Sequence, residues 1–269
     1  MPTLESLPAR DRPTGLAVPP RRMRLWHDGR PLKRWRYVGL YGEDMMLCAA
    51  DVRIAGLPQG FWATWDRTDL RERTVFLPRA VVLADDAVRF GPARLTLEPA
   101  GDAMAVTSQH GRSYIWTRKQ PVRARGTVAG RAVELYGLID DSAGYHARRT
   151  DWQWCAGVGV GNDGAALCFN IVDGVHDAPQ ESERTIWVDG AASELPPATF
   201  ADDLSAVTFP ADPAARLAFA EEARRARSDD FKLMASDYVQ PFGTFSGTLP
   251  GGVAVARGWG VMERHSVRW

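Results

Sequence analysis

Short segments of alternating apolar and polar residues, separated by turn residues, are the feature that most constrains the fold of this chain. From Leu25 onward, FWATWDRT, RTVFLPRAVVLA, AVRFGPARLTLEP and SYIWTRK follow one another at short intervals. The second half continues with AVELYGLID, DWQWCAGVGVG, AALCFNIVDG and RTIWVDG. A period of two residues is typical of β-strands, and many short strands with turns between them favour a sandwich or a barrel. We therefore expect a mostly β protein with antiparallel strands.

One segment departs from this pattern. Asp212 is suited to cap a helix and Pro213 to occupy its first position, and the residues that follow, AARLAFAEEARRAR, are strong helix formers. Glu221 and Arg225 would then lie one turn apart, where opposite charges attract. The arginines near the end of the segment would form a solvated face. The sequence therefore predicts one α-helix near 212–228.

The chain of 269 residues is long enough for one large β domain or two modest ones. The stretch KQPVRAR, around residues 119–125, has the character of a junction between two halves of similar size. We expect a Pro- and Arg-rich N-terminal arm over residues 1–22, a first β domain over 23–120 and a second β domain over 121–269.

The charge balance limits the classes of partner. Lys and Arg together number 33, as do Asp and Glu, so the formal net charge is zero. This balance argues against a nucleic acid or an anionic membrane as a partner bound by bulk charge. No stretch approaches the roughly 18 consecutive apolar residues of a transmembrane helix, and the N-terminal residues lack the apolar region of a signal peptide. We expect a cytoplasmic protein, monomeric or homodimeric.

Motifs for metals and nucleotides are also lacking. Cys48, Cys155 and Cys168 form no CxxC pair, and their odd number favours buried free thiols over a disulfide framework. No HExxH motif or paired-histidine spacing predicts a metal site. The glycine-rich GVGVGNDG at 157–164 precedes another strand where a nucleotide loop would precede a helix, so it predicts a hairpin turn. We expect neither a metal nor another cofactor.

Tryptophan is unusually frequent, with ten residues, and several lie beside polar groups on predicted strands. In the final strand, Trp259, Glu263 and His265 share the face that also carries Val253 and Val255. The interior of a barrel that holds a ligand has this mixed character. A solvated edge strand with scattered tryptophans is the alternative.

Three other segments of the second half repeat the combination of tryptophan with a carboxylate or an amide. DWQWC places Trp152 and Trp154 on one face, ALCFNIVDG contains Asn170, and ERTIWVDG places Glu183 on the face of Trp187. If these faces meet, they form the wall of a pocket. We expect this pocket in the barrel of the C-terminal half.

The densest combination of charge and aromatic surface is YGLIDDSAGYHARRTDWQW, residues 136–154. It contains the adjacent Asp140 and Asp141, followed by His146 and the two tryptophans. Either the segment connects two strands with its charges in water, or it forms the mouth or wall of the pocket. Arg148 and Arg149 are then expected to balance the two acids.

These motifs, with HDGRPLKRWRYVGLYG in the first half and GWGVMERHSVRW at the end, resemble a bacterial family of uncharacterised lipocalin-like proteins. That family is distantly similar to carotenoid 1,2-hydratase, AttH-type proteins, tocopherol cyclase and lipocalin-like Diels–Alderases. The resemblance implies two calycin-like β-barrels or sandwiches packed together, with an apolar ligand cavity. It places Asp140 and Asp141 at the aspartate of a stretch that this group often shows, Gly144 at its glycine, and Trp152 and Trp154 at an aromatic pair. The chain departs from that stretch at Ser142 and Ala143.

The resulting hypothesis is a cofactor-independent enzyme that acts on an apolar isoprenoid or polyene-like molecule by acid-assisted hydration, cyclisation or isomerisation. A carboxylic acid in an apolar pocket keeps its proton and can protonate an alkene, and indole faces stabilise the resulting cation. Asp140 or Asp141 is the first choice for the acid and Glu263 the second. The other expected site residues are His146 and His265 to orient a water, and Trp152, Trp154, Trp187, Trp259, Asn170 and Glu183 to bind the substrate.

Two other functions remain open at this point. The first is binding of a lipid or another small hydrophobic molecule without catalysis. The second is a pericyclase template, which folds its substrate by the shape of the cavity. A structural or interaction module without a ligand is a further alternative.

Overall fold

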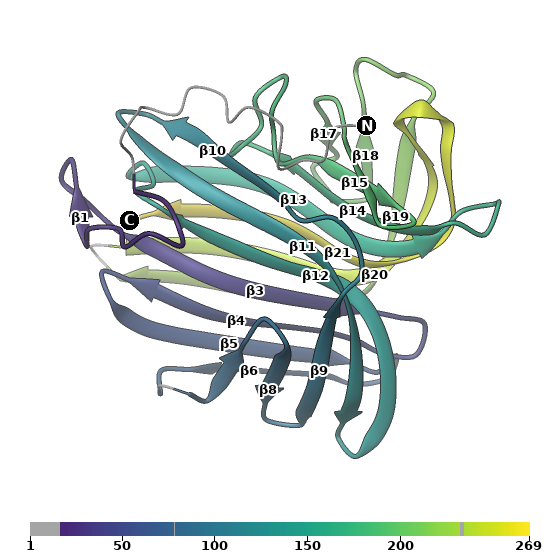
Figure 1. Ribbon diagram of the computed structural model, residues 1–269, viewed down its shortest axis with the longest axis horizontal. Coiled ribbons are helices and arrows are strands. Elements are labelled where there is room, and N and C mark those ends of the chain that lie inside the picture. The colour runs from purple at the N-terminus through teal and green to yellow at the C-terminus, as the bar shows by residue number, and fades with distance from the viewer. Residues whose placement is uncertain (1–16, 78, 232–233) are drawn as a thin grey trace.

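In the computed structural model, which describes residues 17–77, 79–231 and 234–269, the chain forms two large antiparallel β-sheets and a two-stranded ribbon (Figure 1). The ribbon pairs β1 (Trp26–His27) with β2 (Arg30–Pro31). Its turn has positive φ angles at Asp28 (50°) and Gly29 (72°), as a two-residue hairpin turn requires. Most of the N-terminal arm predicted over residues 1–22 lies outside the described residues.

The first sheet contains the strands between residues 33 and 144. Their order is β6-β5-β4-β3-β12-β11-β9-β8-β7, and β10 pairs with β11. The strands are β3 (Lys33–Tyr41), β4 (Met46–Ile54), β5 (Leu57–Trp65), β6 (Leu70–Val75), β7 (Val81–Leu83), β8 (Ala87–Phe90), β9 (Ala93–Pro99), β10 (Met104–His110), β11 (Ser113–Val128) and β12 (Arg131–Gly144).

The second sheet contains the remaining strands, in the order β16-β15-β14-β13-β21-β20-β19-β18-β17. They are β13 (Arg149–Val160), β14 (Ala166–Asp173), β15 (Thr185–Val188), β16 (Ala191–Glu194), β17 (Thr199–Phe200), β18 (Ala206–Thr208), β19 (Arg216–Phe231), β20 (Met234–Leu249) and β21 (Val253–Arg268). The predicted mostly β fold of large antiparallel sheets is confirmed.

The two sheets follow the same path. In each sheet the first four strands form a meander that ends at one edge of the sheet. The chain then crosses to the opposite edge and adds strands inward until the last strand pairs with the first, β12 with β3 and β21 with β13. The junction predicted near residue 120 lies inside β11, and the chain passes to the second sheet only after Gly144. The turn predicted within 157–164 is present, where Gly164 (φ 85°) donates its amide to the Gly161 carbonyl at 3.0 Å.

Three of the four clusters of buried apolar side chains belong to the two large sheets. The first sheet alone forms one, which includes Val38, Leu40, Leu47, Phe90 and Leu95. The second sheet alone forms another, which includes Phe169, Phe200, Leu217, Phe245 and Met262. The third lies between the sheets and combines residues of both, including Tyr37, Cys48, Ala50, Trp154, Phe242 and Val261. The strands that face the other sheet are therefore buried on both sides.

All three cysteines are free and buried, as predicted.

The predicted α-helix near 212–228 is wrong. Most of this segment belongs to β19, which pairs with β20 along its length, and the described residues contain no α-helix. Leu217 alternates with exposed residues and reaches the core of the second sheet, so pairing with β20 outweighs local helix propensity. A bulge between Glu221 and Ala223 adds one residue to β19 and reverses the faces beyond it. As a result Arg225, predicted to be solvated, is buried toward the first sheet.

A second irregularity corrects the expected faces of the last strand. The register of β21 against β20 shifts between Phe245 and Gly247, where the partners change from Gly258 to Val255. Val255 therefore packs in the core of the second sheet, while Trp259 packs against the cluster between the sheets. The alternation predicted from Val253 onward is interrupted at this position.

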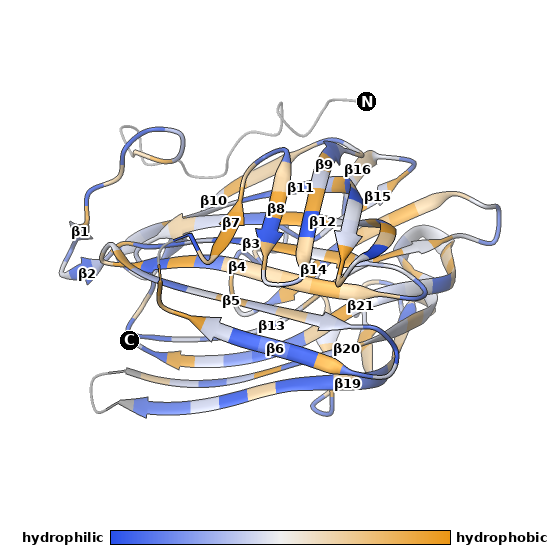
Figure 2. Ribbon diagram, turned by 90° about the horizontal axis from the view of Figure 1, so that it is seen from below, coloured by the Kyte–Doolittle hydropathy of each residue, from blue (hydrophilic) through white to orange (hydrophobic). Residues whose placement is uncertain are grey.

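The sheets are joined at one side by polar contacts between β19 and the region of β6. Figure 2 shows hydrophilic stretches on both strands, which lie on the same side of the molecule. Arg225 Nε contacts Glu72 Oε2 at 2.9 Å, and Arg227 donates to Thr74 Oγ1 at 3.0 Å. The described part of the chain contains no helix that is long and apolar enough to cross a membrane.

Candidate active site

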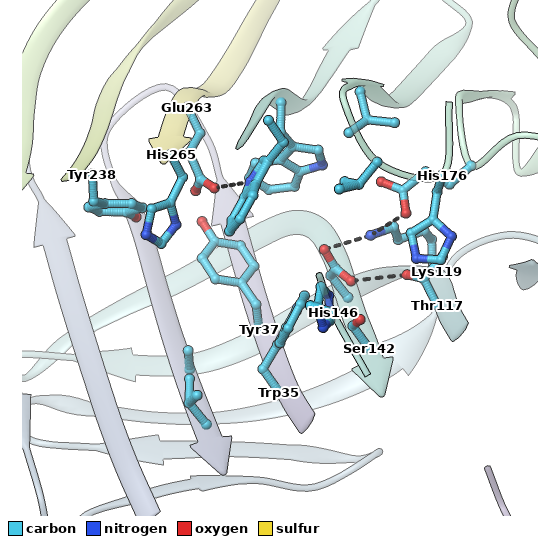
Figure 3. A pocket seen from close by; sticks show the side chains of 18 of the residues that line it. Trp35, Tyr37, Thr117, Lys119, Ser142, His146, His176, Tyr238, Glu263 and His265 are labelled. Atoms are coloured by element: carbon cyan, nitrogen blue, oxygen red, sulfur yellow. Dashed lines mark hydrogen bonds and ion pairs between the residues drawn. The ribbon is translucent and has the colours of Figure 1, made fainter. Parts of the chain in front are cut away.

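A cavity of about 170 Å³ lies between the two sheets (Figure 3). Residues of β3, β4, β5, β11 and β12 line it from the first sheet, and residues of β13, β14, β20 and β21 from the second. The lining residues are Trp35, Tyr37, Ala50, Val52, Phe61, Thr117, Lys119, Asp140, Ser142, His146, Trp152, Trp154, Val172, Val175, His176, Glu183, Tyr238, Glu263, His265 and Trp269. The sequence predicts the pocket within the C-terminal barrel, but both sheets build it because their doubly buried strands face each other.

Aromatic side chains form much of the wall. Trp154 meets the ring of Tyr37 edge to face, with ring centroids 5.5 Å apart. Trp35 lies 5.1 Å from the ring of His146, and Trp152 lies 4.4 Å from the ring of His265. Much of the cavity wall is therefore apolar, as in sites that bind apolar molecules.

Glu263 is the carboxyl whose environment most favours proton transfer. Trp152 Nε1 donates to its Oε1 at 2.7 Å, and Gln240 Nε2 donates to its Oε2 at 2.8 Å. The residue is 8% exposed. Burial outweighs these hydrogen bonds and raises the pKa of Glu263 to about 7. At neutral pH this side chain exists in both protonation states, as a general acid or base requires.

The orientation of the Gln240 amide follows from its other contacts. Its Oε1 accepts a hydrogen bond from Arg225 Nη1 at 2.8 Å, which leaves its NH₂ group to donate to Glu263. The Arg225 guanidinium lies 4.6 Å from the ring centroid of Phe61. Arg225 thus connects β19 to the carboxyl through Gln240.

Two further carboxyls of the cavity, those of Asp140 and Glu183, lie beside the Lys119 ammonium. Lys119 Nζ lies 2.6 Å from Asp140 Oδ2 and 3.3 Å from Glu183 Oε2, and all three side chains are buried. Burial raises the pKa of both carboxyls, that of Glu183 to about 6, although the ammonium opposes this change. Burial disfavours the charge on Lys119, but attraction to the two carboxylates outweighs it and raises the Lys119 pKa. Two carboxyls therefore share one cation.

The histidines of the cavity are neutral. Burial lowers the pKa of His265 to about 3 and lowers the pKa of His146 and His176 well below their ordinary value. His265 Nε2 lies 2.8 Å from Ser236 Oγ, and His176 Nδ1 lies 2.8 Å from Ser108 Oγ. Each ring can therefore donate one hydrogen bond and accept another.

The structure brings most of the sequence-predicted site residues to this cavity. Seven of them line it: Asp140, His146, Trp152, Trp154, Glu183, Glu263 and His265. Asn170 lies directly behind the wall, where its Oδ1 accepts a hydrogen bond from Trp154 Nε1 at 2.7 Å and its Nδ2 donates to the Glu183 carbonyl at 2.9 Å.

Asp141, Trp187 and Trp259 do not line the cavity. Asp141 lies on the opposite face of β12 from Asp140, where Arg36 binds both of its carboxylate oxygens at 2.6 and 2.8 Å. The indole of Trp187 is buried and donates to the Asp102 carbonyl at 2.7 Å. Trp259 stacks with Arg257, whose guanidinium lies 5.3 Å from the ring centroid.

The arginines expected to balance the two acids have other contacts. Arg149 pairs with Asp151 at 2.9 Å, and the Arg148 carbonyl accepts the backbone amide of Trp269. Lys119 and Arg36 balance Asp140 and Asp141 in their place.

Several site residues were missed at the sequence level. Lys119 lies directly opposite Asp140 in the register of the β11–β12 hairpin, and the sequence analysis did not predict this hairpin or its register. Trp35 and Tyr37 alternate in KRWRYVG, which was a usable signal for a pocket face in the first half. Arg225 and Gln240 carried no signal, because the sequence predicts a helix at Arg225.

Residues 90–269 match a family described as "Domain of unknown function (DUF2804)". No curated protein matches the sequence at a significant level. Within the described residues, no group of three or more His, Cys, Asp or Glu side chains is placed to hold a metal ion.

Several solved structures are similar to the chain, among them the following three. A candidate AttH protein from Nitrosomonas europaea is 14% identical, with a TM-score of 0.47, and the match covers 92% of this chain and 98% of that one. Kievitone hydratase from Nectria haematococca is 10% identical, with a TM-score of 0.47 and coverage of 88% and 89%. CghA with Sch210972 is 8% identical, with a TM-score of 0.40 and coverage of 87% for both chains. The match over residues 90–269 confirms the resemblance to an uncharacterised family that the motifs predict.

Proposed function

This chain belongs to the DUF2804 family, and we propose that it is a cofactor-independent acid–base catalyst that acts on an apolar isoprenoid or polyene-like molecule in the cavity between its sheets. The proposed proton donor is Glu263. One observation carries the proposal: a buried carboxyl, whose pKa is raised to about 7, accepts a hydrogen bond from an indole in a cavity lined by aromatic side chains.

The proposed reaction begins when the protonated Glu263 transfers its proton to a carbon of a C=C bond. A C–H bond forms with the electron pair of the double bond, the neighbouring carbon becomes a cation, and Glu263 becomes a carboxylate. Hydrogen bonds from Trp152 and Gln240 stabilise that carboxylate. An indole face stabilises the cation by about 0.5–2 kcal/mol where water is excluded.

The cation then has three outcomes within the proposed reaction class. Water adds to it and loses a proton, which gives hydration. A second double bond attacks it and a proton is lost, which gives cyclisation. Loss of a proton from an adjacent carbon gives isomerisation. In each case the Glu263 carboxylate, or the Asp140 and Glu183 carboxyls across the cavity, can accept the released proton.

Deuterium incorporation measures proton transfer to carbon whichever of these products forms. Farnesol and farnesene are incubated with the protein in D₂O, and deuterium bound to carbon is measured by mass spectrometry. Glu263→Gln keeps the size of the side chain and removes the acid, so we expect incorporation to slow by about 10²–10⁴-fold. Glu98→Gln, an exposed acid on β9, is the matched control.

Asp141→Asn tests the neighbouring acid that the sequence favours, and we expect it to leave incorporation unchanged because Asp141 lies outside the cavity. Equal incorporation by the wild type and Glu263→Gln would contradict the proposed donor. No incorporation by the wild type above that of the solvent would contradict acid catalysis on these isoprenoids.

A non-catalytic binding function is the second candidate, and one observation favours it. Both carboxylate oxygens of Glu263 already accept hydrogen bonds within the protein, as they would in a closed binding cavity. Native mass spectrometry of protein purified from its host would then detect a ligand that stays chemically unchanged. A pericyclase template would lose turnover in Trp154→Ala and keep it in Glu263→Gln.

A further inference from the structure

Two buried histidine nitrogens in the cavity lack a hydrogen-bond partner within the described residues. They are Nδ1 of His146 and Nε2 of His176. Both residues line the cavity, and they are 3% and 6% exposed. A buried polar atom without a partner costs free energy, so such an atom beside a cavity indicates a site for a polar group of a ligand.

The two rings lie away from the proposed proton donor. Figure 3 shows His146 and His176 on the side of the cavity that holds Lys119, while Glu263 lies on the other side with His265. Tyr37 lies between His265 and His146 in this view. The cavity therefore has a polar end that the proton transfer to carbon does not use.

The chemistry of this end selects a neutral oxygen. Burial keeps both imidazoles uncharged, with smaller contributions from Lys33 at His146 and from Lys119 at His176. Asp140 and Glu183 already neutralise Lys119, and they would repel a phosphate or a carboxylate at this end. Neutral imidazoles both donate and accept hydrogen bonds, which matches a hydroxyl group and also a carbonyl oxygen.

The surroundings hold both rings in place. Ser108 Oγ lies 2.8 Å from the other nitrogen of His176, and this contact leaves Nε2 for a ligand. The His146 ring lies between Trp35, at 5.1 Å, and His110, at 5.7 Å. Rings fixed in this way lose little freedom when a ligand binds.

We propose that His146 and His176 bind a hydroxyl or keto oxygen of the ligand, so the molecule in this cavity is an oxygenated apolar compound. This inference rests on the proposed function and narrows its substrate class. The oxygen lies at the histidine end, and the apolar body extends along the indole rings toward Glu263.

Two small probes of equal ring size test the inference. 2-Naphthol carries a hydroxyl where 2-methylnaphthalene carries a methyl group, and their dissociation constants are measured by fluorescence titration. We expect the wild type to bind 2-naphthol about tenfold more tightly, because one or two hydrogen bonds are made in a buried site. In His146→Phe and His176→Phe this preference should fall toward parity while 2-methylnaphthalene still binds. His27→Phe, outside the cavity, should keep it.

Imidazole ¹⁵N spectra give a second readout that a purely structural role would not change. 2-Naphthol should shift the Nε2 resonance of His176, and 2-methylnaphthalene should not. Equal affinity for both probes in the wild type, or a preference that survives in both cavity variants, overturns the oxygen site and leaves the role of Glu263 standing. If neither probe binds, the cavity is not a ligand site, and the proposed function fails as well.

Discussion

The first and second sheets both pair their first strand with their last, yet they present different carboxyls to the cavity between them. β12 of the first sheet presents Asp140, which lies 2.6 Å from the Lys119 ammonium of the neighbouring strand. β21 of the second sheet presents Glu263, whose partners are the uncharged indole of Trp152 and amide of Gln240. Both carboxyls are buried, but only Asp140 has a cation as its direct partner.

This difference shows how the partner of a buried carboxyl determines its proton occupancy. The Lys119 ammonium favours the Asp140 carboxylate and opposes the effect of burial, although burial still raises the pKa of Asp140. Neutral donors only partly offset burial, so the pKa of Glu263 rises to about 7 and the group can deliver a proton. Two sheets with the same path thus supply groups of different chemical character.

The largest expected effect comes from removal of the cation. Lys119→Met leaves Asp140 and Glu183 buried without their partner, so we expect the free energy of unfolding at pH 8 to fall by about 3–5 kcal/mol. The loss should be smaller at pH 5, because protonation neutralises the carboxyls. Urea denaturation at both pH values measures this.

Two further variants sharpen that result. Asp140→Asn added to Lys119→Met should restore part of the stability, because one buried charge is removed. Arg118→Met changes the neighbouring residue on the more exposed face of β11, and we expect it to cost about 1 kcal/mol or less. An equal loss for Lys119→Met at pH 5 and pH 8 would show that the charges of the two carboxyls do not cause it.

The next effect is the pH dependence of stability caused by Glu263. Its pKa rises from 4.5 to about 7 on folding, so between these values the folded chain holds a proton that the unfolded chain has released. The contribution of Glu263 to the free energy of unfolding is therefore most favourable below pH 4.5 and falls by about 3 kcal/mol as the pH rises through 7. The side chain in Glu263→Gln does not titrate. The difference in unfolding free energy between wild type and variant should therefore change by about 3 kcal/mol between pH 4.5 and pH 7. A constant difference would contradict the raised pKa.

The smallest effect concerns Gln240. Gln240→Leu removes one hydrogen bond that stabilises the Glu263 carboxylate, so the pKa of Glu263 should rise above about 7. We expect the loss of this hydrogen bond to shift the pKa of Glu263 by about one unit or less. ¹³C NMR of the labelled carboxyl measures the pKa, and Gln109→Leu, an exposed glutamine on β10, is the control. An unchanged pKa would show that Gln240 does not support the carboxylate.

Many residues of the site could be predicted from residue types and strand faces, but the contacts between these residues could not. Trp152 and Trp154 were found because they share one face of β13, and Glu263 because it shares a face of β21 with Trp259 and His265. Both are local properties of a strand. Lys119 is 21 positions before Asp140 in the chain, and only the register of β11 with β12 places them together. The choice between Asp140 and Asp141 likewise depended on which face of β12 meets the second sheet.

The error at 212–228 has a similar cause. Helix formers such as Ala and Glu adopt the extended conformation here because β20 provides backbone partners along the whole segment. One bulge then reverses the faces and buries Arg225, whose charge had indicated solvent. A sequence pattern does not reveal a single inserted residue in a strand pair.

By itself the sequence determined that this chain is a β protein, because strand periodicity and turn residues act over a few neighbouring positions. It also placed the acidic and aromatic groups on particular strand faces. Only the tertiary structure decided that the two sheets pack face to face, that their shared interior contains a cavity, and which carboxyl meets a cation there. Those outcomes depend on contacts between segments far apart in the chain, and burial by the opposite sheet sets the pKa values that give the site its proposed chemistry.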